Sequence, residues 1–130
     1  MKIIIAGSRD ITSVNEVGFA CFKSGLFAEA TEIISGGAKG VDSLGEVIAN
    51  MCGLPVKQFI PDWTKYGKKA GFLRNIEMAE YADALIAVWD GNSRGTQHMI
   101  DIAKAKGLKV FVHIVENKLD NAKNGGIVST

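Results

Sequence analysis

The stretch Ile33-Ile34-Ser35-Gly36-Gly37-Ala38-Lys39-Gly40-Val41-Asp42 decides the fold of this chain. A short β-branched run ends in a glycine-rich turn, and an amphipathic helical pattern begins directly after it. Glycine permits positive φ and a close approach of the backbone to a ligand. The start of a helix adds unpaired N–H groups and a partial positive charge. The stretch therefore predicts a strand, a ligand-binding turn and a helix in succession.

Two other junctions repeat this order of features. Ile3 to Ala6 precedes the turn Gly7-Ser8-Arg9-Asp10, and Leu85 to Trp89 precedes the turn Asp90-Gly91-Asn92-Ser93-Arg94-Gly95-Thr96. Turns of this kind bind anions through backbone amides. Together they indicate one shared anion site, and a nucleotide is the ligand that fits it best.

Strand and helix patterns alternate along the whole chain. Strands are expected at 2–6, 31–35, 55–60, 83–89 and 108–114, and helices at 14–29, 42–52, 70–82 and 95–106. The near-continuous apolar runs are typical of a parallel sheet buried on both faces. We expect an α/β fold: a Rossmann-like, doubly wound, mostly parallel five-stranded sheet in the order 3-2-1-4-5, with helices on both faces. This order brings the three glycine turns to one crevice at the carboxyl ends of the strands.

Local signals mark the ends and inner faces of the helices. Ser13 and Glu16 form a capping-box pattern, and Asp42 is a candidate cap of the second helix. Apolar spacing predicts the inward residues, which are Leu44, Val47, Ile48 and Met51 in the second helix and Thr96, Met99, Ile100 and Ala103 in the fourth.

The composition is that of one globular domain. The 130 residues are 47% hydrophobic and 22% charged. We expect a nucleotide-binding domain over residues 1–115 and a polar C-terminal tail over 116–130. No apolar run approaches the ~20 residues of a membrane span, and no signal peptide is evident, so a cytoplasmic protein without a membrane partner is expected. Cys21 and Cys52 are expected to be reduced, packed thiols.

Positive charge gathers near the expected ligand turns. The formal net charge is only +1, which does not favour nucleic acid as a partner. However, 7 of the 15 Lys and Arg residues lie in or beside the proposed ligand loops: Arg9, Lys39, Lys65, Lys68, Lys69, Arg74 and Arg94. They predict a cationic pocket. The alternative is that exposed glycine loops carry lysines for solubility alone.

The link over 61–71 contains Trp63 and Tyr66 among three lysines. These aromatic side chains could stack on a base while the lysines hold phosphates. For Trp63, a hydrophobic plug under a surface loop is an equal alternative.

Familiar cofactor and metal motifs are absent from the sequence. No G-x-G-x-x-G follows the first strand, and the loop at 37–40 is too short for a Walker A motif. His98 and His113 are isolated from other ligand types, which argues against zinc. We therefore expect no metal and no cofactor.

Four motifs together resemble the SLOG superfamily, which includes the DprA/Smf and LOG proteins. They are Gly7-Ser8-Arg9, Ser35-Gly36-Gly37-Ala38-x-Gly40-Val41-Asp42, Trp63-x-x-Tyr66-Gly67-x-x-Ala70-Gly71-x-x-Arg74-Asn75-x-x-Met78 and Gly95-Thr96. The resemblance covers residues 2–112 and is greatest to the small YspA-like, DUF2493-type proteins. It implies a Rossmann-like domain that binds a nucleotide or nucleotide-derived small ligand, in order to sense, sequester or process it.

The resemblance also implies an alternative activity. LOG proteins hydrolyse the N-glycosidic bond of nucleoside monophosphates with an arginine and a glutamate. Arg74 is a candidate for that arginine, but the glutamate position is Met99, which cannot transfer a proton. If the chain is an enzyme, it would be a nucleotide hydrolase whose candidate catalytic residues are Arg74, Asp42 and Asp90.

The predicted ligand-binding residues are those of the turns and of the arginine motif: Gly7, Ser8, Arg9, Gly36, Gly37, Ala38, Gly40, Asp42, Arg74, Asn75, Gly91, Asn92, Ser93, Arg94, Gly95 and Thr96. Backbone amides of Gly36, Gly37 and Gly95 are expected to bind phosphate. Arg74 would pair with phosphate or a ribose oxygen. Asp42 is either a helix cap or a ribose-binding carboxylate.

Three functions follow as hypotheses: a nucleotide-binding module, a LOG-related hydrolase, and DprA-like binding of single-stranded nucleic acid. The near-neutral charge makes the third the weakest. A homodimer or higher homo-oligomer is expected because relatives pair through helices that flank the site.

Overall fold

The computed structural model describes residues 1–116, and its centre is a five-stranded parallel sheet in the order β3-β2-β1-β4-β5. The strands are β1 (Lys2–Gly7), β2 (Glu32–Ser35), β3 (Val56–Gln58), β4 (Ala84–Trp89) and β5 (Lys109–Ile114). Ile3 of β1 is in register with Ile33 of β2 and with Ala84 of β4. The predicted fold class and strand order are confirmed. Of the expected tail over 116–130, all but Glu116 lies outside the described residues.

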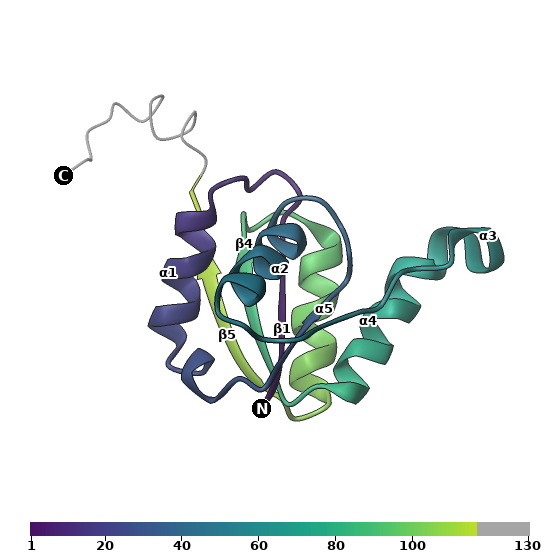
Figure 1. Ribbon diagram of the computed structural model, residues 1–130. Coiled ribbons are helices and arrows are strands. Elements are labelled where there is room, and N and C mark those ends of the chain that lie inside the picture. Colours follow the sequence, from purple (N-terminus) through teal and green to yellow (C-terminus); the bar gives the residue numbers. More distant parts are fainter. Residues whose placement is uncertain (117–130) are drawn as a thin grey trace, which may run out of the picture.

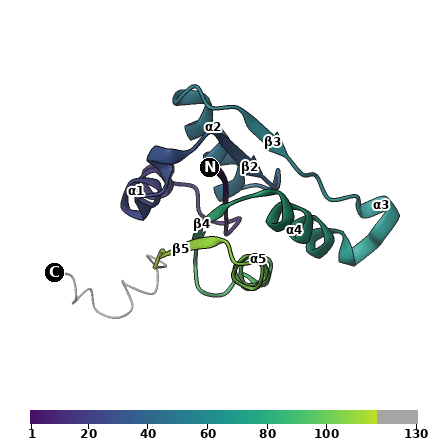
Figure 2. The same cartoon turned by 90° about the horizontal axis from the view of Figure 1, so that it is seen from below.

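Helices cover both faces of the sheet (Figures 1 and 2). The longer helices are α1 (Val14–Ser24), α2 (Val41–Met51), α4 (Ala70–Tyr81) and α5 (Arg94–Ala105). Three short elements complete the set: α3 (Trp63–Tyr66) and the 3-10 turns η1 (Phe27–Glu29) and η2 (Gly67–Lys69). No described helix combines the length and hydrophobicity needed to cross a bilayer.

The core has two halves because successive strand residues point to opposite faces of the sheet. Ile3 and Ile5 of β1 belong to the half under α1 and α2, whereas Ile4 and Ala6 belong to the half under α4 and α5. The three isoleucines are completely buried. Each contributes about 1.5–3 kcal/mol of burial free energy, so the central strand is a rigid platform for the turn that follows it.

The first helix is shorter than its sequence pattern predicts. The predicted helix over 14–29 ends at Ser24, because Gly25 adopts a left-handed conformation with φ of 69° and donates its amide to the Phe22 carbonyl. The chain then forms η1. At the other end the predicted Ser13 cap is present, since Ser13 Oγ accepts the Glu16 amide at 3.3 Å. The Glu16 carboxylate instead contacts His113 at 3.0 Å.

The predicted inner face of α2 is confirmed in part, because Leu44 and Ile48 pack against the core. Val47 and Met51 are 45% and 77% exposed, so their prediction as inward residues was wrong. The residues that face inward include Gly45, where an added Cβ would lie 2.8 Å from the Ile5 side chain. Helix and strand can approach this closely only at a glycine, and that contact decides which side of α2 is buried. In α5 the predicted stripe is confirmed: Thr96, Met99, Ile100 and Ala103 are buried.

The link over 61–71 is helical rather than an irregular loop. Asp62 caps α3 by accepting the Lys65 amide at 3.0 Å. Figures 1 and 2 show α3 projecting from the end of α4, away from the sheet, and residues 62–69 are exposed. Trp63 is 53% exposed, so it does not act as a plug under a surface loop.

The two cysteines differ in their surroundings. Cys21 is buried in α1, where burial and, to a lesser extent, the nearby Cys52 raise the pKa of its thiol to about 11. Cys52 is exposed just after α2, so its prediction as a packed thiol was wrong. Both are free thiols.

Candidate functional site

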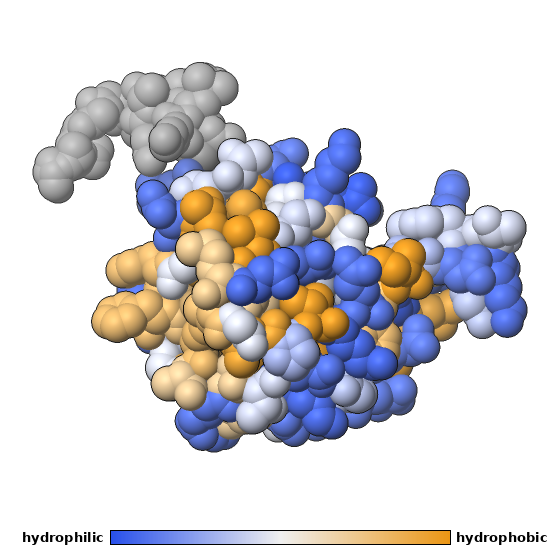
Figure 3. Space-filling model, viewed as in Figure 1, coloured by the Kyte–Doolittle hydropathy of each residue, from blue (hydrophilic) through white to orange (hydrophobic). Residues whose placement is uncertain are grey.

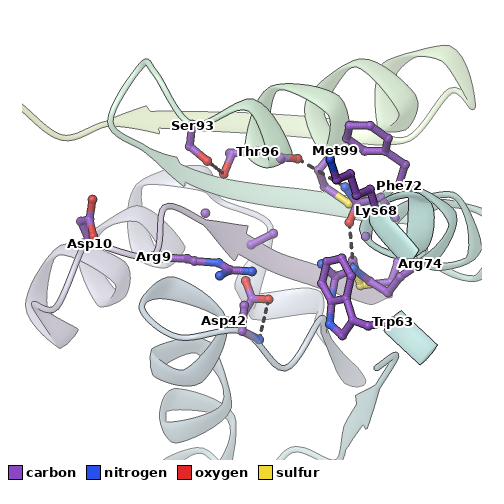
Figure 4. Close-up of a pocket in the computed structure, with 17 residues that line it drawn as sticks. Arg9, Asp10, Asp42, Trp63, Lys68, Phe72, Arg74, Ser93, Thr96 and Met99 are labelled. Atoms are coloured by element: carbon purple, nitrogen blue, oxygen red, sulfur yellow. Dashed lines mark hydrogen bonds between the residues drawn. The ribbon is translucent and has the colours of Figure 1, made fainter. Parts of the chain in front are cut away.

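A cavity of about 470 Å³ lies beyond the carboxyl end of β1, between the starts of α2, α4 and α5 (Figure 4). This volume is in the range of roughly 300–1,000 Å³ that small-molecule sites occupy. The position is also the one at which ligands bind to open parallel sheets, because the strand order reverses between β1 and β4. The cavity is therefore the candidate site of the protein.

The expected turn segments meet at this cavity. Its lining includes these predicted ligand residues: Gly7, Arg9, Ala38, Asp42, Arg74, Asn75, Ser93, Gly95 and Thr96. The remaining predicted residues do not line it: Ser8, Gly36, Gly37, Gly40, Gly91, Asn92 and Arg94. Members of all four expected segments thus lie around one hollow, although fewer residues face it than the motifs imply.

Other lining residues were not among those predicted to bind ligand: Ala6, Asp10, Trp63, Lys68, Gly71, Phe72, Met78 and Met99. For Trp63 and Lys68 the sequence carried a signal, namely aromatic and basic residues in one link. Met78 belonged to the third family motif, whereas Phe72 carried no signal of its own, because an apolar residue in a helix is usually a core residue. Met99, which the resemblance to LOG proteins aligns with their glutamate, lines the cavity.

The side chains of Asp42 and Arg74 both approach Gly36 at the place where a Cβ would lie. A Cβ added to Gly36 would be 2.5 Å from Arg74 Nη1 and 2.8 Å from Asp42 Oδ2. Only glycine leaves room for both charged groups beneath the turn. Arg74 Nη1 donates to the Gly36 carbonyl, and Asp42 Oδ2 accepts the Ala38 amide at 3.2 Å.

Two backbone amides of the glycine loop after β2, those of Gly37 and Ala38, donate to groups of the protein itself. The Gly37 amide donates to Ser35 Oγ at 3.1 Å, and the Ala38 amide donates to Asp42. Ser35 in turn donates to the Glu46 carboxylate at 2.6 Å. In this conformation the Gly37 amide is not free for the phosphate that it was expected to bind. The N-cap of α2 is Gly40, with Asp42 inside the first turn rather than at the cap.

In contrast to the glycine loop, the start of α5 has backbone amides that are not bonded within the helix. The first amide bonded along this helix is that of Gln97, which donates to the Ser93 carbonyl at 3.1 Å. The amides before it, Gly95 and Thr96 among them, have no acceptor within the helix. The hydroxyls of Ser93 and Thr96 lie 3.2 Å apart at the same point. This end of the cavity therefore offers free donors and the positive end of a helix.

Asp90 shapes this loop and does not line the cavity. Its Oδ1 accepts the amides of Asn92 and Ser93 at 2.8 and 2.9 Å. Burial acts to raise the pKa of Asp90, but these amides and the Ser8 hydroxyl outweigh it and lower the pKa overall. The carboxylate thus orders the turn before α5.

Burial and the attraction between Asp42 and Arg74 act in opposite directions on the pKa values of these two groups. Burial raises the pKa of Asp42 from its ordinary 3.8 to about 6, and the Ala38 amide and Arg74 only partly oppose this. Burial lowers the pKa of Arg74, against the attraction of Asp42 and together with the repulsion of Arg9. Figure 4 shows the Arg9 side chain reaching across the cavity toward Asp42.

Asn75 connects Arg74 to α5. Its Oδ1 accepts from Arg74 Nε at 3.0 Å, and its Nδ2 lies 3.3 Å from the Gly95 carbonyl and 3.1 Å from His98 Nδ1. Burial lowers the pKa of His98, which favours the neutral ring that can accept this contact. Helices α4 and α5 are thereby held at a set spacing across the cavity.

Comparison with solved structures defines the class of fold. DNA processing protein A (DprA) from Streptococcus pneumoniae superposes with a TM-score of 0.69 at 21% sequence identity. The match covers 95% of this chain but only 53% of that protein, so the chain spans about half its length. The chain therefore has the Rossmann-like fold of a DprA domain. No family model matches the sequence.

Sequence comparison identifies the family within this fold. The Gene 61 protein of Mycobacterium phage D29 is 38% identical over 85 residues, which are 61% of this chain and 68% of the phage protein. The chain belongs to the family of this phage protein.

Proposed function

We propose that the protein binds a nucleotide or nucleotide-derived small ligand in the cavity beyond β1, and that it senses, sequesters or processes that ligand. We also assign it to the SLOG superfamily, nearest to the small YspA-like, DUF2493-type proteins. The DprA-like fold supports this assignment. So does the meeting of residues from the Gly7, Arg74 and Gly95 motifs around one cavity.

One observation carries the proposal: three cationic side chains from separate segments, Arg9, Lys68 and Arg74, line a cavity that the open start of α5 also faces. Against the carboxylates of Asp10 and Asp42, the three cations leave an excess of positive charge in the cavity, which favours an anionic ligand. The phosphate would bind the Ser93 and Thr96 hydroxyls and the free amides of α5. The exposed rings of Trp63 and Phe72, at the opposite end, would pack against the base.

Thermal unfolding and calorimetry with a panel of nucleotides test this function. The panel contains mono-, di- and cyclic nucleotides and ADP-ribose derivatives. A ligand at 100-fold excess over its Kd stabilises the folded state by ~2.7 kcal/mol, which a melting curve resolves. The Arg74→Met variant should lose the response, whereas Arg94→Met, at an exposed arginine outside the cavity, should keep it. No shift and no heat with any member of the panel would refute the proposal.

A nucleotide hydrolase is the second candidate, because Asp42 is a buried carboxyl group with a pKa of about 6 that lines the cavity beside Arg74. A carboxyl group with this pKa can donate or accept a proton near neutral pH. It would supply the proton that Met99 cannot. In the reaction, the Asp42 carboxyl group would protonate the base as its bond to C1′ of the ribose breaks, water would add to C1′, and the proton that this water releases would return to Asp42.

Chromatography for free base or ribose 5-phosphate after incubation with nucleoside monophosphates tests this activity. Asp42→Asn should abolish turnover while binding persists, and Asp101→Asn should retain turnover because Asp101 is exposed and outside the cavity. Absence of product from all nucleotides at high enzyme concentration would exclude it.

Binding of single-stranded nucleic acid is a lesser candidate. The similar structure is a DNA processing protein by name. In this chain, the projecting residues 62–69 expose Trp63 and Tyr66 beside lysines. Oligonucleotide affinity should then fall steeply with salt and be lost in Trp63→Ala. Salt-independent or absent binding would dismiss it.

A homodimer or higher homo-oligomer also remains our proposal. Apolar side chains are exposed over α1, where Phe19 and Phe22 are 51% and 83% exposed, and Figure 3 shows this apolar surface. A surface of this kind favours association. Light scattering of the wild type and of Phe22→Ser would show a dimer that the variant weakens, or a monomer in both, which would reject the proposal.

A further inference from the structure

Of the three helix starts at the cavity, those of α2 and α5 differ in one respect. At α5 the first-turn amides have no acceptor within the helix. At α2 a carboxylate of the protein itself is present: Asp42, which is 5% exposed and accepts the Ala38 amide. The protein thus holds one internal anion at one of the two places where a phosphate could otherwise bind.

The groups around the Asp42 carboxylate are of the kind that bind phosphate in proteins. Its carboxylate has an amide donor from the glycine loop, lies in the first turn of a helix and is close to the Arg74 guanidinium. It also lines the cavity. A second anion placed against this buried carboxylate would meet like charge, which is unfavourable.

We propose that Asp42 is a selectivity residue that closes the glycine loop to phosphate. The cavity then accepts a ligand with one phosphate group at α5 and with hydroxyl groups, such as those of a ribose, facing Asp42. Ligands with a second phosphate are disfavoured. This inference rests on the proposed function of the same cavity.

Glu46 provides a matched control for charge. It is on the same helix, four residues after Asp42, and carries the same unit charge. Its carboxylate accepts from Ser35 Oγ at 2.6 Å and from Gln58 Nε2 at 2.8 Å, and it does not line the cavity. Removing its charge changes the local field without opening the anion position.

The test is calorimetry of the wild type, Asp42→Asn and Glu46→Gln with four pairs of probes: AMP and ADP, GMP and GDP, CMP and CDP, and UMP and UDP. For the pair that binds best, the wild type should bind the monophosphate at least about tenfold more tightly than the diphosphate. Asp42→Asn should reduce this ratio about fivefold or more, since the carboxamide is neutral and still accepts the Ala38 amide. Glu46→Gln should retain the ratio.

A wild type that binds the diphosphate as tightly as the monophosphate would overturn the inference, whether or not the variants fold. An equal change of the ratio in Asp42→Asn and Glu46→Gln would also overturn it, because the effect would then be a general one of charge. Both results leave nucleotide binding itself intact. Failure of all eight probes and of the wider nucleotide panel to bind the wild type would instead refute the proposed function, and this inference with it.

Discussion

Arg74 donates from Nε to Oδ1 of Asn75, its neighbour in the chain, at 3.0 Å. Consecutive side chains on a helix diverge by roughly 100°, so such a pair needs a further constraint. Here the Asn75 amide is held on its other side by the Gly95 carbonyl and His98, while Arg74 is held by the Gly36 carbonyl. The pair therefore joins the glycine loop to the start of α5 across the cavity.

Asn75→Ala should destabilise the protein by about 1–3 kcal/mol, because it removes a buried side chain that bonds the charged, part-buried Arg74 Nε and the Gly95 carbonyl. Urea unfolding measures this loss. Asn50→Ala, at an exposed asparagine of α2, should change the free energy of unfolding by less than about 0.5 kcal/mol. Equal effects at both positions would show that the hydrogen bonds of Asn75 contribute nothing to stability.

Stability should depend on pH through Asp42. Its folded-state pKa of about 6 is above its ordinary 3.8, so between these values the folded state binds more protons than the unfolded state. The contribution of Asp42 to stability is therefore lost as pH rises through this window. Relative to Asp42→Asn, the wild type should lose up to about 3 kcal/mol between about pH 4 and about pH 7. Parallel curves of unfolding free energy against pH would contradict this result.

Arg74→Lys should weaken ligand binding about tenfold or more although it preserves the charge. Lysine cannot reproduce the planar fork that contacts the Gly36 carbonyl and Asn75 while facing the cavity. Calorimetry with the nucleotide that gives the largest thermal shift measures the change. The same substitution at exposed Arg94 should leave the Kd within about twofold, and the reverse order would place the anion site elsewhere.

Gly36→Ala should disturb the site directly. The added Cβ would lie 2.5 Å from Arg74 Nη1 and 2.8 Å from Asp42 Oδ2, so both side chains must move. We expect a loss of affinity similar to that of Arg74→Lys and a destabilisation of about 1–3 kcal/mol. Thermal melts and calorimetry separate the two effects.

Gly18 is the control for that substitution, because nothing lies within 4 Å of an added Cβ there. Gly18→Ala, inside α1, should stabilise the protein by about 0.5–1 kcal/mol through helix propensity alone. Ligand affinity should stay unchanged. If Gly36→Ala behaved in the same way, the crowding around Gly36 would not be real.

The sheet could be predicted because its signals are local. Strands β1 and β4 are continuous apolar runs, whereas the edge strand β3 is short and mostly polar, and the helices between the strands require parallel connections of one hand. The helices depart from their predicted ends and faces where a single residue outweighs the sequence pattern. Gly25 ended α1 early by adopting positive φ, and Gly45 turned the inner face of α2 toward Ile5.

The site was predicted only in part, because local sequence signals mark its turns but not the directions of the side chains around them. Glycine turns mark where a backbone can approach a ligand, and Gly7, Ala38 and Gly95 do line the cavity. The use of each amide was not predictable, because a hydrogen bond such as that between Ala38 and Asp42 depends on side-chain direction. Phe72 lines the cavity through the placement of α4, which no local pattern encodes.

By itself, then, the sequence determined the strand order, the helices on both faces and the end of the sheet where the glycine turns gather, since these follow from periodicity and chain connectivity. Only the tertiary structure decided which of these turns keeps backbone amides free for a ligand. Folding directs the Asp42 carboxylate into the loop before α2 and leaves the start of α5 free. That choice depends on groups distant in sequence, among them Gly36 and Arg74, which only the packed chain brings together.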